Sequence, residues 1–418
     1  MAGEGLRKLR LLVLVVSVVV LGVDALTHLQ MLSEDEQLEL NTQLKQLNKP
    51  AIKSFKTESG DIIDCVDIYK QPSLDHPLLK NHAIQMKPTT TPKGLIGDTS
   101  KVKRLLQDLP NINSCPPGSV PIRRTTREDL IAARSFKPLW SDQATDNLRP
   151  STTIDAAGYH LATLNYRAKV YGAKSQINVW NPIPSVDQYS SARCGCLKAL
   201  EINRTPYKLV GEYATVQPKV FQNVTRLSTY WTADGYQNTG CYDQLCRGFI
   251  QIDSRITPGM PIRPVSTYNG PQYGIPVSIH QRYNCPLVGC EHGELVVQLG
   301  DKYIGYWPKG LLPGLENGAT TAAWGGEIYS PTTEAGPAMG SGHFPEEGFS
   351  KSAFVNQIQV AESSISRGFV DPWVHSSVLF RTNLSVLGSL IGLLKMGAGD
   401  IISSLEGQVA AGEEKLIP

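Results

Sequence analysis

Residues 229–249 (TYWTADGYQNTGCYDQLCRGF) are the most informative stretch of this 418-residue chain. Two further compact motifs follow, Trp324-Gly325-Gly326-Glu327 and residues 340–349 (GSGHFPEEGF). A generic globular core does not produce aromatic residues, glycines, a local cysteine pair and a placed carboxylate in this order. The three motifs therefore indicate a functional site rather than core packing alone.

The scaffold around these motifs reads as β-structure. From about residue 158 the sequence forms short β-branched and aromatic runs separated by Gly, Pro and Asn. The runs are residues 168–171, 175–179, 249–252, 275–279, 294–299 and 303–307. Many short strands with frequent turn signals are typical of an all-β sandwich rather than of βαβ units. We therefore predict an all-β fold, an antiparallel β-sandwich of two sheets.

The N-terminus has the layout of a secretory signal. Arg7, Lys8 and Arg10 precede an apolar run over residues 11–23. This run is shorter than the ~20 residues that span a bilayer, so a cleaved signal over residues 1–25 is favoured over a membrane anchor. We expect a secreted protein, located outside the cell, in the cell wall or in the vacuole, without stable membrane association. The net charge of +2 and the lack of basic runs interleaved with aromatic residues argue against nucleic-acid binding.

The eight cysteines fit an oxidising compartment. Cys241 and Cys246 form the best candidate disulfide, because they close a small local loop. Cys194 and Cys196 cannot easily pair with each other, because two positions apart on a strand their side chains point the same way but lie too far apart. The pairing stays open for Cys65, Cys115, Cys194, Cys196, Cys285 and Cys290. Zinc is a weaker alternative because the spacings suit a structural zinc site poorly, so we expect no metal.

Three glycosylation sequons begin at Asn203, Asn223 and Asn383. Each is a short motif that chance also produces, and secretion favours the use of one or more of them.

The region after the signal reads as a separate small unit. Residues 33–47 predict an amphipathic helix, with Ser33 and Glu36 as a capping box. A strand-like segment at residues 54–69 and a proline-punctuated connector at residues 71–82 follow.

Taken together, these motifs resemble the neprosin family of plant secreted glutamic peptidases. Residues 54–82 and 115–124 (CPPGSVPIRR) resemble the neprosin activation peptide. The resemblance implies an endopeptidase that cleaves after proline in acid, acts on proline-rich polypeptides and needs no cofactor. It also implies a zymogen, inhibited by its own pro-segment. The implied domains are a pro-region over 26–125, a catalytic sandwich over 150–366 and a divergent tail over 367–418.

The resemblance assigns Glu327 to one half of a catalytic carboxylate pair. In such a pair one carboxyl keeps a proton while the other activates water. The second glutamate of the family motif is displaced here. Gly211 stands at the position where the family has this glutamate, and Glu212 is the next residue. A one-residue slip turns a strand side chain to the opposite face, so Glu212 fits only if a β-bulge restores its direction. Glu201 is a more distant candidate.

Other residues allow a functional and a structural interpretation. Trp231, Tyr306 and Trp324 could line a substrate cleft, or they could belong to the sandwich core. His343 and the sequence Glu291-His292-Gly293-Glu294 do not form a metal-binding motif and favour structural roles.

Two segments depart from the family pattern. Residues 189–200 (YSSARCGCLKAL) do not look like the family's strand and indicate either a diverged insert or an error in the gene model. Residues 384–396 predict an amphipathic helix where the family has a cysteine-containing segment. A catalytically impaired relative that binds a peptide or a glycan outside the cell is therefore the alternative function.

Overall fold

The computed structural model describes residues 33–86, 103–104, 114–135, 158–198, 207–216, 223–234, 239–284, 291–315, 317–331, 334–344, 347–362, 368–372 and 377–381. Several expected features lie outside the described residues: the signal segment, the helix at 384–396, Glu201, Asn203, Asn383, Cys285 and Cys290. Asn223 is described, and it is exposed.

Helix α2 (Glu34–Leu47) begins at the predicted capping box. The Glu36 amide donates to Ser33 Oγ at 3.2 Å, and the Ser33 amide donates to the Glu36 carboxylate at 2.8 Å. These bonds satisfy amides that lack partners in a first helical turn, which confirms the prediction. The helix belongs to the first of two compact units, Met1–Gln46, and all the strands belong to the second, Leu47–Pro418. In the part of the chain that the structure describes, no helix has the length and apolar character to cross a membrane.

A three-stranded antiparallel sheet opens the second unit. It has the order β1 (Ala51–Lys56), β2 (Ile62–Asp67) and β4 (Ser119–Arg123). The disulfide Cys65–Cys115 links β2 to the segment that leads into β4. Side chains of this sheet and of the residue after β2 pack together in a small apolar cluster: Val66, Ile68, Val120 and Ile122. Helix α3 (Arg127–Ser135) follows β4 and completes what we call the pro-segment, residues 51–135 as far as they are described.

The connector at residues 71–82 folds into short 3-10 turns, as its prolines suggest. Its turns are η2 (Pro72–Asp75) and η3 (Pro77–Leu79), and η1 (Ile68–Lys70) immediately precedes them. Proline fixes the backbone in the conformation that the first turn of a helix needs.

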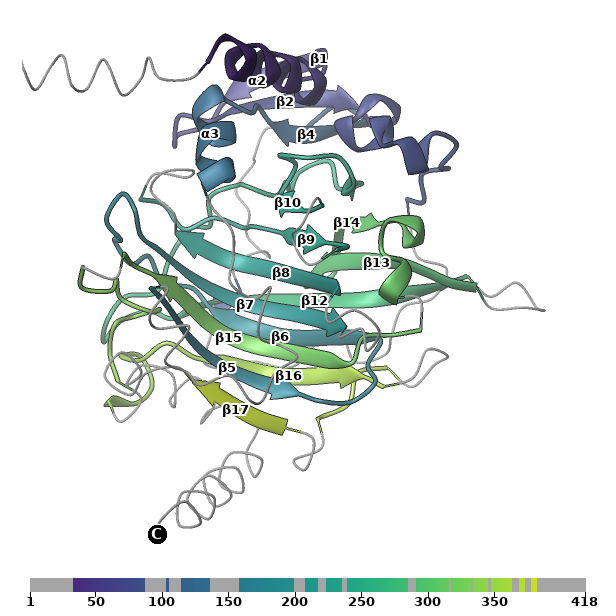
Figure 1. The fold of residues 1–418 in the computed structure, drawn as a ribbon. Coiled ribbons are helices and arrows are strands. Elements are labelled where there is room, and N and C mark those ends of the chain that lie inside the picture. Colours follow the sequence, from purple (N-terminus) through teal and green to yellow (C-terminus); the bar gives the residue numbers. More distant parts are fainter. Residues whose placement is uncertain are drawn as a thin grey trace, which may run out of the picture. The chain divides into compact units, whose positions relative to one another are not determined.

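Two large sheets form the sandwich, with the strand orders drawn in Figure 1. The β15 sheet has the order β10 (Cys241–Tyr242), β9 (Tyr230–Thr232), β8 (Tyr207–Val216), β7 (Tyr189–Lys198), β15 (Thr321–Tyr329), β5 (Tyr159–Tyr166) and β17 (Ser377–Arg381). The β12 sheet has the order β11 (Ile250–Gln251), β14 (Lys302–Trp307), β13 (Glu291–Leu299), β12 (Tyr273–Asn284), β6 (Gly172–Asn178) and β16 (Val355–Ala361). Strand β3 (Lys103–Arg104) pairs in parallel with β12, and the other pairs are antiparallel. The predicted antiparallel sandwich of two sheets is confirmed.

One apolar core fills the space between these sheets. It takes side chains from alternate positions, such as Ile275, Val277 and Ile279 on β12 and Trp324 and Ile328 on β15. Alternation sends every second side chain of a strand to one face, so the intervening positions lie on the outer faces. Turns η4 (Lys309–Leu311) and η5 (Pro313–Leu315) add Leu311 and Leu315 to this core.

Several strand expectations needed correction. Within the stretch 189–200, which was expected to be an insert, residues 189–198 form β7, which lies between β8 and β15. The sheet also extends past residue 366, because β17 pairs with β5. Residues 168–171 make only an isolated bridge between Val170 and Ala319. Strand pairing depends on distant partners, so local residue preferences do not reveal it.

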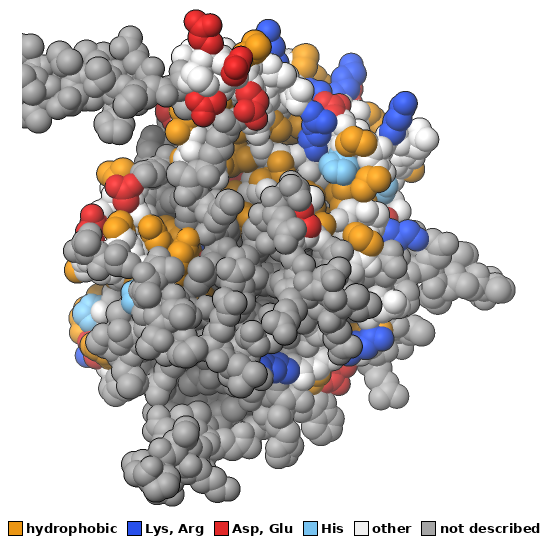
Figure 2. Space-filling model, in the orientation of Figure 1, with side chains coloured by type: hydrophobic (Ala, Val, Ile, Leu, Met, Phe, Trp, Pro, Cys, Tyr) orange, Lys and Arg blue, Asp and Glu red, His pale blue; other side chains and the backbone are white. Residues whose placement is uncertain are grey.

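Charged side chains are mixed on the surface. The face in Figure 2 carries acidic and basic side chains in its described part, without an extended field of one sign. This fits the net charge of +2.

Candidate active site

Glu327 lies on the outer face of the β15 sheet, on a central strand. Its neighbours in register are Leu161 on β5 and Ser191 on β7. Trp324 and Ile328 point into the core, so alternation puts Glu327 on the opposite face. This face is also closed to water, because Glu327 has no exposed surface.

Backbone geometry requires the glycine two positions before Glu327. Gly325 has a φ of 148°, and a Cβ at this position would lie 2.1 Å from the carbonyl oxygen of Ala162. A side chain here would force β15 and β5 apart. Glycine therefore sets the local path of the strand that carries Glu327.

Arg193 holds the Glu327 carboxylate by a bidentate ion pair. Its Nη1 donates to Oε2 at 2.9 Å and its Nη2 donates to Oε1 at 2.8 Å. Arg193 Nε donates to Ser191 Oγ at 2.7 Å, which orients the guanidinium. Like Glu327, Arg193 has no exposed surface. A buried charge of this kind is tolerated only with a close partner of opposite sign.

Three tyrosines surround this ion pair. The Tyr189 hydroxyl donates a hydrogen bond to Glu327. The ring of Tyr329 lies 6.0 Å from that of Tyr189 and 4.7 Å from that of Tyr159, measured between centroids. Burial, followed by the charge of Glu327, raises the pKa of Tyr189 well above its ordinary value, and the same two causes raise the pKa of Tyr159. Both hydroxyls therefore keep their protons and can act as hydrogen-bond donors beside the carboxylate.

The backbone register contains the bulge that Glu212 needs. Ala192 of β7 pairs with Ala214 of β8, but the next residue, Arg193, pairs with Glu212. Tyr213 is therefore the extra residue of a β-bulge. Residues directly paired in antiparallel strands share a face, so Glu212 holds a position on the same face as Arg193. Its role as a catalytic partner stays a prediction.

The aromatic residues expected in a cleft lie elsewhere. Trp231 and Trp324 are buried in the core between the sheets, which corrects the cleft interpretation. Trp324 and Glu327 are three positions apart on one strand, and this odd spacing sends them to opposite faces. Tyr306 is buried as well, and its hydroxyl contacts the pro-segment.

The cysteine predictions are borne out where the chain is described. Cys241 and Cys246 form the expected disulfide. Cys194 and Cys196 are buried free thiols on β7. Burial raises the pKa of Cys194 to about 12, so this thiol is not a nucleophile.

The hydrogen bond of the His343 ring goes to Glu347 rather than to Glu327, and the other histidine motif lies on a strand of the other sheet. His343 Nδ1 is 2.9 Å from Glu347 Oε1, and the Tyr268 hydroxyl also donates to Glu347. The segment from Glu291 to Glu294 belongs to β13 rather than to a turn. Among the residues described, no group of three or more His, Cys, Asp or Glu side chains is placed to hold a metal ion.

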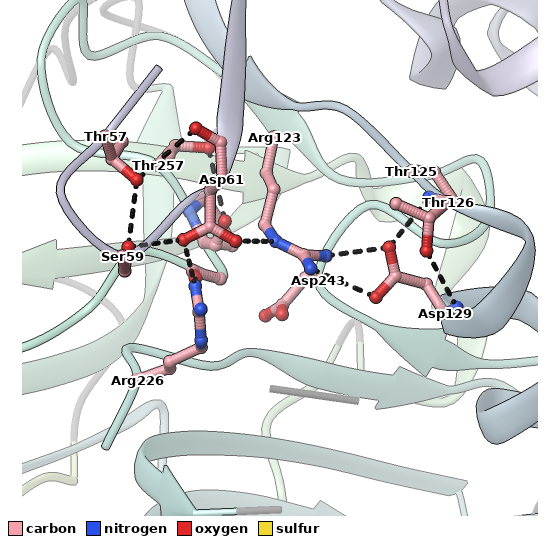
Figure 3. Close-up of polar contacts among 12 residues, drawn as sticks. Thr57, Ser59, Asp61, Arg123, Thr125, Thr126, Asp129, Arg226, Asp243 and Thr257 are labelled. Atoms are coloured by element: carbon pink, nitrogen blue, oxygen red, sulfur yellow. Dashed lines mark hydrogen bonds and ion pairs between the residues drawn. The ribbon is translucent and has the colours of Figure 1, made fainter. Parts of the chain in front are cut away.

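The pro-segment is tied to the sandwich by a buried ion pair. Asp61, in the turn between β1 and β2, accepts from Arg226 Nη1 and from Arg123 Nε, both at 2.8 Å (Figure 3). Arg123 also forms a bidentate pair with Asp129 of α3, and Arg226 donates to the Gly259 carbonyl at 2.7 Å. Asp61 therefore connects the pro-segment to the sandwich through the Arg226 guanidinium, and its bond to Arg123 lies within the pro-segment.

Gln71 makes a second attachment at the edge of the β12 sheet. Its Oε1 accepts from the Gln251 amide at 2.8 Å, and its Nε2 donates to the Gln251 carbonyl at 3.2 Å. Strand β11 is the edge strand there. The side-chain amide of Gln71 thus replaces the peptide group of a neighbouring strand and satisfies both backbone groups.

Residues 82–85 make a third attachment. His82 Nε2 lies 2.9 Å from the Tyr306 hydroxyl, and the Gln85 amide donates to the same hydroxyl at 3.0 Å. Gln85 Nε2 donates to Glu294 Oε1 at 2.7 Å. All three attachments join residues before 135 to the sandwich, as expected of a pro-segment that docks on its own catalytic domain.

Family comparison agrees with this architecture. The chain matches the neprosin activation peptide over residues 54–165 and Neprosin over residues 187–383. The first match includes the three-stranded sheet and β5, and the second includes β7 and β15 with Arg193 and Glu327. The chain therefore belongs to the neprosin family, a family of peptidases, and carries the activation peptide of a zymogen ahead of its sandwich.

Proposed function

We propose that this protein is a secreted endopeptidase of the glutamic type, which hydrolyses peptide bonds after proline in acid. The observation that carries the proposal is the position of Glu327: a wholly buried carboxylate on a central strand, beside tyrosine hydroxyls. Such a carboxylate can accept a proton from water while neighbouring donors stabilise the oxyanion.

The reaction needs no group beyond the chain and a water molecule. The water oxygen attacks the scissile carbonyl carbon, and Glu327 takes the proton that the water loses. Glu327 then returns this proton to the leaving amine nitrogen as the C–N bond breaks. Glu212 is the proposed second carboxyl, supported by its register position opposite Arg193. A proton retained near the two glutamates favours work in acid.

Three further features support the finer parts of the proposal. Tyr159, Tyr189 and Tyr329 offer aromatic surfaces that suit the flat apolar ring of proline. The apolar N-terminal segment and the two disulfides in the described part of the chain favour secretion. The docked activation peptide favours inhibition of the enzyme by its own pro-segment until that segment is released.

The test starts from the full-length purified chain, and release of its pro-segment is followed by gel electrophoresis, because activity is expected only after that release. The chain is incubated at acid pH with proline-containing peptides, and the products are identified by mass spectrometry. We expect cleavage after proline, and a loss of about 10²–10⁴-fold in E327Q. The exposed Glu58 provides the matched control, because E58Q changes a surface carboxyl only. Cleavage that survives in E327Q excludes Glu327 as the base.

A second function is favoured by one observation, the Arg193–Glu327 ion pair. A carboxylate engaged at both oxygens is a poorer base, so a catalytically impaired relative that binds peptides or glycans is the alternative. Binding of a proline-rich peptide or of a glycan, measured by calorimetry without any cleavage, supports this alternative.

A further inference from the structure

Arg193 occupies the middle of a row of three strands on the outer face of the β15 sheet. Glu327 lies on β15, Arg193 lies on β7, and Glu212 holds the paired register position on β8. One buried guanidinium thus sits between the two positions that the chain offers for catalytic carboxyls. This arrangement differs from two carboxyls that face each other with only a proton between them.

The charge of Arg193 changes what the site requires. Two carboxylates at short range cannot both ionise unless a proton or a cation offsets their charge. A guanidinium stays protonated throughout the pH range of proteins, and its fork matches both oxygens of a carboxylate. Arg193 already makes this bidentate contact with Glu327, at 2.9 and 2.8 Å. Arg193 therefore offsets the charge of the carboxylate at every pH, whereas a shared proton offsets it only in acid.

The other ionisable groups that face Glu327 are tyrosines, among the side chains that the structure describes. Tyr189 comes from β7, Tyr159 from β5 and Tyr329 from β15 itself. The hydroxyl of Tyr189 donates to Glu327, and burial raises the pKa of Tyr189 well above its ordinary value. A proton donor therefore remains beside the carboxylate at neutral pH, where a carboxylic acid would have lost its proton.

We propose that Arg193 is a positioning residue that keeps Glu327 ionised and fixed, so that hydrolysis does not depend on a shared proton and extends from acid to neutral pH. The inference rests on the proposed function, because it concerns the base of that reaction. It makes Arg193 the residue that sets the working pH range of this chain.

The first measurement is the pH–rate profile on a proline-containing peptide, taken after the pro-segment of the full-length protein has been released. We expect the wild-type rate at about pH 7 to stay within about tenfold of the rate at about pH 4. In R193Q the buried Glu327 carboxyl loses its cation and is protonated at about pH 4, where it cannot act as base, so the ratio of the pH 7 rate to the pH 4 rate should rise roughly a hundredfold. R167Q is the matched control, since Arg167 is exposed, and its profile should follow the wild type. An unchanged ratio in R193Q overturns the proposal.

The second measurement does not need activity. Infrared difference spectra between wild type and E327Q isolate the bands of the Glu327 side chain. At about pH 4 we expect a carboxylate band in the wild type and a protonated carbonyl band when the same difference is taken in the R193Q background. A protonated Glu327 in the wild type overturns the proposal. A carboxylate band without cleavage of any peptide leaves the role of Arg193 intact and removes the proposed function instead.

R193Q leaves a buried carboxylate without its cation and could prevent folding. In that case R193K carries the test, because lysine keeps the charge but cannot bind both oxygens. We expect R193K to lose rate at every pH while it keeps the wild-type ratio between about pH 7 and about pH 4. Activity confined to acid in R193K contradicts the proposal.

Discussion

Asp61 Oδ2 accepts a hydrogen bond from Arg226 Nη1 at 2.8 Å, with side chains that are only 6% and 1% exposed. This one ion pair joins a tight turn of the pro-segment to the sandwich. Loss of one partner from a buried pair costs more than the pair itself contributes, because the remaining charge has no counterion.

The substitution D61N should therefore loosen the pro-segment. We expect a cost of about 3–5 kcal/mol, since the buried Arg226 loses the carboxylate that accepts its hydrogen bond. Hydrogen–deuterium exchange of full-length protein should rise in β1, β2 and β4, while the sandwich core keeps its protection. The control is D67N, because Asp67 makes only a local bond to the Tyr69 amide. Equal exchange in D61N and D67N contradicts the prediction.

The attachment of the pro-segment through Asp61 should depend on pH only in strong acid. Burial alone would raise the pKa of Asp61, but hydrogen bonds from Arg226, Arg123 and Ser59 outweigh it and lower the pKa. The pKa of Asp64 is lowered in the same way by Arg124 and Ser54.

A lowered folded-state pKa contributes stability above the pKa of the unfolded chain, and that stability is lost as the pH falls through the folded value. Exchange protection of β2 should hold through mild acid and decline below about pH 4. A loss of protection already between about pH 5 and pH 7 means that other groups govern release.

The substitution Q71A should weaken the attachment at the edge of β11. It removes the side-chain amide that pairs with both backbone groups of Gln251, and these groups are left without their partner. The expected cost is about 1–3 kcal/mol of unfolding free energy, measured by urea denaturation. The exposed neighbour Lys70 supplies the control, K70A, which should change stability by less than about 0.5 kcal/mol.

The substitution G325A should disrupt the site strand. The backbone at Gly325 has a φ of 148°, and an added Cβ would meet the Ala162 carbonyl oxygen at 2.1 Å. We expect a loss of more than about 4 kcal/mol, or no folded protein at all. G310A is the control, because a Cβ there meets nothing within 4 Å. A thermal unfolding midpoint that is equal in the two variants contradicts the geometry.

Local patterns predicted the parts of the fold that local forces form. The capping box at Ser33 and Glu36 involves residues three positions apart, and the disulfide Cys241–Cys246 closes a loop within one short segment. Alternating apolar residues predicted the strands of the β12 sheet for the same reason, since one face of each strand must be buried.

Which side chains meet Glu327 depends on the register between strands that are distant in sequence. Arg193 and Glu327 are 134 residues apart, and their pairing follows from the order in which β7 and β15 join the sheet. The bulge at Tyr213 follows from the way β7 pairs with β8, which the sequence of β8 alone does not fix. Residues 189–200 looked like an insert because they do not resemble the family's strand sequence, although residues 189–198 form a strand at the centre of the sheet.

By itself, the order of amino acids determined a two-sheet β-sandwich, a capped first helix, a local disulfide and the kinship of the chain with the neprosin family. Only the tertiary structure decided that a guanidinium meets the carboxylate of Glu327 and that Trp231 and Trp324 lie in the core. The physical reason is that capping and alternation act over a few residues, whereas the charge environment of a buried group is set by whichever strands the sheet brings beside it.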